Sequence, residues 1–158
     1  MQHANTPIAA DNLAIRPIEE ADHYDWLPIW NENCDNQLDT KVTDITWQRL
    51  CDPENPVNGL IAKDTKGNAI GILHYILHPT TGNIDLVCYM QDLFISPDYR
   101  RQGIAKMLLI ELAGLAEKEG WNRIYWLADK NNEAAQNLYR NIGIALDFSL
   151  HVLPVNMG

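Results

Sequence analysis

The sequence is poor in positive charge, in cysteine and in long apolar runs. Its 158 residues carry 12 basic and 21 acidic side chains, which gives a formal net charge of −9. Nucleic acid and anionic membrane surfaces are therefore not expected as main partners. No apolar run reaches membrane-spanning length, and residues 1–12 lack the basic and apolar pattern of a secretory signal. We accordingly expect a cytoplasmic protein.

Metal and nucleotide motifs are also missing. Cys34, Cys51 and Cys88 are odd in number and lie at no metal-ligand spacing, which favours a reducing compartment over a disulfide scaffold. His74 and His78 have no obvious third ligand, so we expect no metal. A P-loop would need Gly-Lys-Ser/Thr, which is absent. Cys88, without a flanking base, is expected to be a core residue rather than an acyl carrier.

Length and composition indicate one domain with a single core, since 46% of the residues are hydrophobic. We expect residues 1–12 to form a flexible tail and residues 13–158 a single α+β domain. After Arg123, the strand at 123–128 is apolar and has the character of a buried strand, so we expect it to be central and parallel to the strand before it. The expected strands are 13–18, 59–63, 69–77, 84–95, 123–128 and 146–153, and the expected helices are 21–33, 43–51, 104–119 and 132–140.

Charge is distributed unevenly along the chain. The first 60 residues hold eleven acidic side chains against three basic ones, whereas Arg100, Arg101 and Lys106 form the only tight basic cluster. A cationic substrate on one side and an anionic cofactor on the other would produce this pattern. Ordinary solubilising acidity is the alternative for most of the acidic side chains.

The basic cluster lies in a stretch that reads as strand, loop and helix. Leu93, Phe94 and Ile95 are strand formers, and Ser96-Pro97-Asp98 ends the strand. After Gly103 the apolar residues recur with helical spacing. The backbone N–H groups of such a loop, followed by a helix N-terminus, form a binding site for phosphate.

Three motifs follow one another along the chain: Gln91-Asp92-Leu93-Phe94-Ile95, Arg100-x-x-Gly103-x-Ala105 and Asn132-Glu133-x5-Tyr139-x3-Gly143. Together they resemble the GCN5-related N-acetyltransferase (GNAT) superfamily over residues 13–153. More narrowly, the chain is similar to the spermidine/spermine and thialysine N-acetyltransferase branch. The resemblance implies a mixed, mostly antiparallel sheet of six to seven strands, flanked by about four helices. The fourth and fifth strands would be parallel and splayed around the cofactor.

The resemblance implies acetyl-CoA as co-substrate. Main-chain groups of Phe94 and Ile95 would pair with the pantetheine arm, and the basic loop would hold the pyrophosphate. Asn132 would bind the pantetheine or align the thioester, and Tyr139 would protonate the departing thiolate. The cofactor-binding residues expected on this basis are Phe94, Ile95, Arg100, Arg101, Gln102, Gly103, Ile104, Ala105, Lys106, Asn132 and Tyr139.

The attacking amine must lose a proton, because a free alkyl amine has a pKa of roughly 10. The polyamine enzymes carry Glu at the position of Gln91, and an amide cannot act as the base. Asp92 could take that role, or a water chain could end on Asp85; alternatively, Asp92 holds a loop or helix end. The expected catalytic residues are Tyr139, Asp92 and Gln91. The expected substrate contacts are Trp26, Trp30, Tyr89, Gln91 and Asp92, with core packing as the alternative for the tryptophans.

These observations predict an N-acetyltransferase that moves an acetyl group from acetyl-CoA to a primary amine by direct attack in a ternary complex. The expected acceptor is a small cationic molecule such as a polyamine, a diamine or a lysine-like amino acid. The alternatives are a protein lysine or N-terminal acetyltransferase, and a non-catalytic CoA-binding sensor. A homodimer is expected, since the branch is commonly dimeric.

Overall fold

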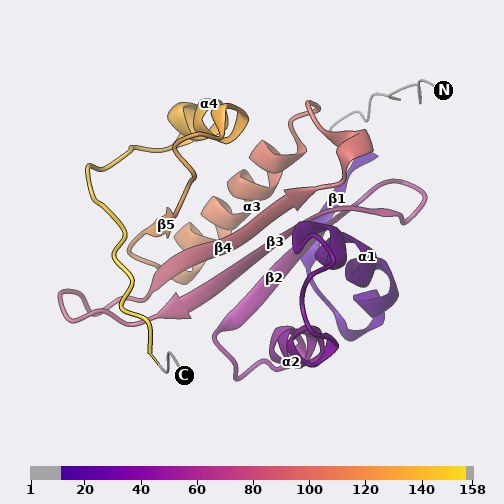
Figure 1. Ribbon diagram of the computed structural model, residues 1–158, viewed down its shortest axis with the longest axis horizontal. Coiled ribbons are helices and arrows are strands. Elements are labelled where there is room, and N and C mark those ends of the chain that lie inside the picture. Colours follow the sequence, from indigo (N-terminus) through magenta and orange to yellow (C-terminus); the bar gives the residue numbers. More distant parts are fainter. Residues whose placement is uncertain (1–11, 156–158) are drawn as a thin grey trace. The chain divides into compact units, whose positions relative to one another are not determined.

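The computed structural model describes residues 12–155. The chain divides into two compact units, residues 1–127 and residues 128–158, which are described separately below (Figure 1). Residues 1–11, most of the expected N-terminal tail, lie outside the described residues.

The first unit is built on one five-stranded sheet. Its first four strands pair in an antiparallel manner with one another, and the fifth is parallel to the fourth. The predicted α+β class and mixed, mostly antiparallel sheet are therefore confirmed. The strands, in both chain and sheet order, are β1 (Ala14–Pro17), β2 (Val57–Lys63), β3 (Ala69–His78), β4 (Val87–Ile95) and β5 (Ile124–Trp126).

The prediction of six to seven strands is wrong for the described residues, because residues 146–153 form no strand there. Leu146, Phe148 and Leu150 recur at the spacing of a strand, yet all three are exposed. Alternating apolar residues favour a strand, but a ladder also needs a second segment with which to pair. For the same reason β5 lies at the sheet edge instead of its centre, and its three residues are only half-buried.

Helices cover both faces of the sheet. Ile72 of β3 packs in one cluster with Trp26 of α1 (His23–Asn33) and Leu50 of α2 (Thr40–Cys51). At the neighbouring Gly71, a Cβ atom would lie 3.4 Å from Leu108 of α3 (Ile104–Glu119). Successive residues of a strand face opposite sides, so α1 and α2 lie on one face and α3 on the other (Figure 1).

The helix boundaries differ from the predicted ones where a cap or turn had not been recognised. A short 3-10 helix, η2 (Glu20–Asp22), precedes α1, which continues through Pro28. α2 begins three residues earlier than expected, because the Asp39 side chain accepts a hydrogen bond from the Lys41 N–H and caps the helix. α3 ends at Glu119, as expected, and is followed by Gly120, whose φ of 74° makes it the C-cap.

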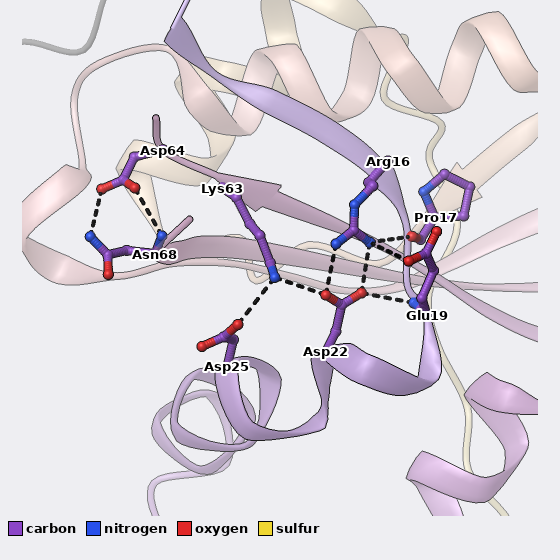
Figure 2. A network of polar contacts seen from close by, with 8 residues as sticks. All are labelled: Arg16, Pro17, Glu19, Asp22, Asp25, Lys63, Asp64 and Asn68. Carbon is purple, nitrogen blue, oxygen red and sulfur yellow. Dashed lines mark hydrogen bonds and ion pairs between the residues drawn. The ribbon is translucent and has the colours of Figure 1, made fainter. Parts of the chain in front are cut away.

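A buried carboxylate ties η2 to β1 and β2. Asp22 is 1% exposed and accepts two hydrogen bonds from the Arg16 guanidinium, at 2.7 and 2.8 Å (Figure 2). It also pairs with Lys63 at 2.8 Å and accepts from the Glu19 N–H at 2.8 Å. The hydrogen bond from Arg16 is the main cause that holds the pKa of Asp22 well below its usual range.

In its described part, residues 128–155, the second unit contains one helix, α4 (Glu133–Ile142). Asn132 caps it, because its side-chain oxygen accepts a hydrogen bond from the Ala135 N–H at 3.1 Å. Residues 143–155 follow without regular secondary structure.

Candidate active site

A β-bulge interrupts the ladder between β3 and β4. His74 is paired with Asp92 and Tyr75 with Met90, so Gln91 is an extra residue in β4. The parallel pairing of β4 with β5 covers residues 88–90 and ends at this bulge. Within the described chain, residues 91–95 therefore have a ladder partner only on the β3 side. Their other edge can pair with an extended ligand, as an added strand does.

The loop after β4 leads through two left-handed residues into the N-terminus of α3. Arg101 and Gly103 both have left-handed backbones, with φ of 63° and 78°, and α3 begins at the next residue. The α3 N-terminus has no side-chain cap, so its first N–H groups remain for an anion. A Cβ atom on Gly103 would meet nothing within 4 Å, so the space beside the loop is open. This geometry fits a pyrophosphate.

The side chains of the loop are engaged differently. Arg100 folds back on β4: its Nε–H donates to the Ile95 carbonyl at 2.9 Å, and its guanidinium lies 5.1 Å from the centre of the Phe94 ring. Arg101 and Lys106 are exposed, so their charges can contribute to an anion site. Gln102 and Ala105 are half-buried, and Ile104 is 3% exposed and belongs to the core.

Asp92 lies one residue beyond the bulge and is hydrogen-bonded on both carboxylate oxygens. The Asn33 side-chain amide, at the end of α1, donates to Oδ1 at 3.3 Å. His74 Nδ1 lies 3.0 Å from Oδ2. The Asp92 side chain is nevertheless 20% exposed, so a ligand can reach it. The carboxylate thus holds a helix end and also remains available for contact.

Trp26 and Trp30 belong to the hydrophobic cluster that joins α1 to the sheet. Their rings stack 5.5 Å apart, and they are 0% and 7% exposed. The Trp26 indole donates to His74 Nε2 at 3.0 Å, and the Trp30 indole donates to the Thr43 hydroxyl at 3.0 Å. This burial fits the alternative of core packing, and it connects Trp26 with Asp92 only through His74.

Tyr89 lies within the β4–β5 pairing, and Gln91 is the first residue of β4 beyond it. Tyr89 is half-buried and stacks on Tyr125 with ring centres 5.0 Å apart. Burial is also the main cause that raises the pKa of its hydroxyl. Gln91 is exposed. Both are therefore within reach of a ligand placed along the open edge of β4.

Tyr139 belongs to α4 in the second unit and is half-buried. Burial raises the pKa of its phenol above the ordinary value, so the group is a neutral proton donor at physiological pH. That state is the one required of a group that protonates a thiolate. Asn132, at the start of the same helix, uses its side-chain oxygen as the cap.

The histidines considered as metal ligands have other partners. His78 contacts the Pro79 carbonyl with one ring nitrogen and the Tyr125 hydroxyl with the other, at 2.9 and 2.8 Å. In residues 12–155, no group of three or more His, Cys, Asp or Glu side chains could hold a metal ion. In the same residues, no helix is long and apolar enough to cross a membrane.

Residues 18–144 match the family model described as "Acetyltransferase (GNAT) family". The chain belongs to this family. This GNAT protein is 31% identical to the D-amino-acid N-acetyltransferase HPA3 of Saccharomyces cerevisiae over 145 residues, which cover 89% of the chain and 90% of the yeast protein. Over 54 residues, about a third of each chain, it is 39% identical to the thialysine N-epsilon-acetyltransferase of Caenorhabditis elegans.

Solved structures share the fold of this acetyltransferase. The ribosomal-protein-alanine N-acetyltransferase from Brucella melitensis superposes with a TM-score of 0.77 and 22% identity, over 90% of this chain and 99% of that one. The structure of AAC(6')-Iy in complex with the bisubstrate analogue CoA-S-monomethyl-acetylneamine gives a TM-score of 0.79 and 16% identity, over 91% and 98%. The predicted GNAT fold is confirmed. The chain is an acetyl-CoA-dependent N-acetyltransferase, with acetyl-CoA as its co-substrate.

The sequence did not reveal two partners of Asp92. From the sequence, His74 is only a possible metal ligand, and Asn33 is only the end of an expected helix. The register between β3 and β4 would have identified His74 as a partner of Asp92, because directly paired residues share a face of the sheet. The bulge at Gln91 shifts that register by one residue and leaves no pattern in the sequence.

Proposed function

We propose that this acetyltransferase modifies a primary amine of a small, positively charged molecule, with lysine-like amino acids, diamines and polyamines as the first candidates. The observation that carries the proposal is the place of Asp92. Its partly exposed carboxylate lies directly beyond the point where β4 and β5 cease to pair. An ammonium group is the natural partner of a carboxylate in such a position. Relatives named for D-amino acids and for thialysine support a small amine as the acceptor.

Each part of the candidate site has its own role in the proposed acetyl transfer. The open edge of residues 91–95 binds the pantetheine arm in strand fashion, and the N–H groups of residues 101–106 hold the pyrophosphate. When bound, acetyl-CoA supplies the thioester that the amine attacks. Asp92 binds the acceptor as an ammonium ion and takes its proton directly or through a water molecule. Tyr139 donates a proton to the leaving thiolate. Because both substrates are held together for direct attack, no covalent enzyme intermediate is needed.

A thiol-release assay with acetyl-CoA tests the proposal. The panel contains D- and L-lysine, ornithine, thialysine, diamines, spermidine, an aminoglycoside and a basic peptide. We expect turnover with one or more of the small amines, and a loss of more than about tenfold in kcat/KM for the amine in Asp92→Asn. Turnover with the basic peptide alone would indicate a protein acetyltransferase. Tight acetyl-CoA binding without turnover would indicate a sensor.

We also propose that the protein is a cytoplasmic homodimer. The three cysteines are free thiols, which supports a reducing compartment. The exposed apolar side chains of Leu146, Phe148 and Leu150 supply a surface that a second copy would cover. Light scattering on the purified protein tests the assembly, and a monomeric mass across the micromolar range would contradict it.

A further inference from the structure

A buried histidine stands between Asp92 and the tryptophan core. His74 is 2% exposed, and both of its ring nitrogens have partners. Nε2 lies 3.0 Å from the Trp26 indole nitrogen, and Nδ1 lies 3.0 Å from Asp92 Oδ2. Trp26 belongs to α1, His74 to β3 and Asp92 to β4. The hydrogen bonds therefore connect α1 with β4 through β3.

The partners determine which ring nitrogen of His74 carries the proton. An indole N–H can only donate a hydrogen bond. His74 Nε2 must therefore accept from Trp26 and carries no hydrogen. The single imidazole proton is then on Nδ1, from which it is donated to the Asp92 carboxylate. A second proton on Nε2 would point at the indole N–H, and the hydrogen bond from Trp26 would be lost.

We infer that His74 is a positioning residue for Asp92, with its tautomer set by Trp26. The inference rests on the proposed function, in which Asp92 receives the acceptor amine. His74 and Asn33 each hold one carboxylate oxygen, so Asp92 is fixed in one orientation while part of it remains exposed. Each oxygen keeps a lone pair for the substrate.

The same contacts exclude a proton relay through the core. A proton taken up by Asp92 cannot pass to His74, because Nδ1 already carries a proton and Nε2 is occupied by the Trp26 indole. The proton must leave on the exposed side of the carboxylate. The neighbouring Cys34 does not compete for it, since burial, followed by the charge of Asp92, raises the pKa of its thiol.

The first test reads the tautomer without requiring activity. Imidazole nitrogen-15 NMR spectra of the full-length protein should show a protonated Nδ1 and an unprotonated Nε2 for His74, with the signal assigned by its loss in His74→Asn. Trp26→Phe removes the donor and should shift the Nε2 resonance. A His74 signal with the proton on Nε2 would overturn the inference, as would an unchanged spectrum in Trp26→Phe.

The second test measures whether His74 acts through Asp92. The Asn amide nitrogen occupies nearly the place of Nδ1, so His74→Asn retains the donor, whereas His74→Leu removes it. We expect His74→Leu to lower kcat/KM for the amine about tenfold, with KM for acetyl-CoA unchanged, because loss of one hydrogen bond to a charged group has this magnitude. His74→Asn should stay within about threefold of the wild type. The matched control is His78→Asn, four residues along the same strand.

A double-mutant cycle separates positioning from general damage. In the Asp92→Asn background, His74→Leu should cause no further loss, since its effect passes through the carboxylate that is already altered. Additive losses, or equal losses in His74→Leu and His74→Asn, would overturn the inference. If the wild type acetylates none of the amines, the proposed function fails, and the NMR test still decides the tautomer and the role of Trp26.

Discussion

Replacement of Asp22 by Asn is expected to destabilise the first unit strongly. The substitution keeps the shape of the side chain but removes a charge that Arg16 and Lys63 both contact. It also turns an amide toward those cationic donors. Breaking a buried ion pair costs about 3–5 kcal/mol. Because the Arg16 side chain is 36% exposed, water re-solvates part of its charge, and we expect the lower end, about 3 kcal/mol.

Urea unfolding monitored by tryptophan fluorescence measures this loss directly. For a domain of this size, a loss of about 3 kcal/mol in unfolding free energy lowers the melting temperature by roughly 6–12 °C. Asp25→Asn is the matched control, because Asp25 also pairs with Lys63, at 3.1 Å, but its side chain is 35% exposed. The control should lose less than about 1 kcal/mol. Equal losses in the two variants, or a loss below about 1 kcal/mol in Asp22→Asn, would refute the assignment of Asp22 as the centre of the network.

The pH dependence of this difference has a defined sign. Arg16 lowers the pKa of Asp22 in the folded state, so folding favours the ionised carboxylate. The stabilisation is complete above the unfolded pKa of about 3.9 and is lost as the pH falls toward the folded pKa. The difference in unfolding free energy between wild type and Asp22→Asn should therefore be constant from pH 7 to about pH 5 and shrink below about pH 4. A difference that grows on acidification would contradict the assignment.

Three further predictions concern the candidate active site. Tyr139→Phe should lower kcat by more than about tenfold with little change in acetyl-CoA affinity, and equal activity in the thiol-release assay would remove Tyr139 from the mechanism. Because burial raises the pKa of Tyr139, this group should cause no alkaline decline of kcat below about pH 10 in a pH–rate profile. Gly103→Asp should weaken acetyl-CoA binding in calorimetry, because a side chain is strained at a φ of 78° and the added carboxylate repels the pyrophosphate. The control is Gly82→Asp, in the β3–β4 turn, where a Cβ atom would meet nothing within 4 Å; it should leave binding unchanged.

Local signals in the sequence were sufficient to predict the strand, loop and helix that form the proposed cofactor side of the candidate site. Strand formers before Ser96, a glycine before a helical apolar pattern, and Gly120 at its end each act over a few residues, and all appear in the structure. The β2–β3 turn at residues 64–68 also depends on local contacts, since the Asp64 side chain accepts hydrogen bonds from the backbone N–H groups of Lys66 and Asn68. The order of strands at the sheet edge depends on pairings between distant segments, and there the prediction of a central fifth strand failed.

The bulge at Gln91 explains why the proposed acceptor side of the site was harder to predict. In a regular strand Met90 and Asp92 would face the same side, because side chains alternate with a period of two. Here Met90 is paired with Tyr75 and Asp92 with His74, and these neighbours on β3 face opposite sides. The extra residue therefore turns Asp92 toward Asn33 and His74 while Met90 stays buried on the side of α3. The bulge that ends the β4–β5 pairing thus also sets the orientation of the Asp92 carboxylate, so Gln91 contributes to the proposed acceptor site through its backbone.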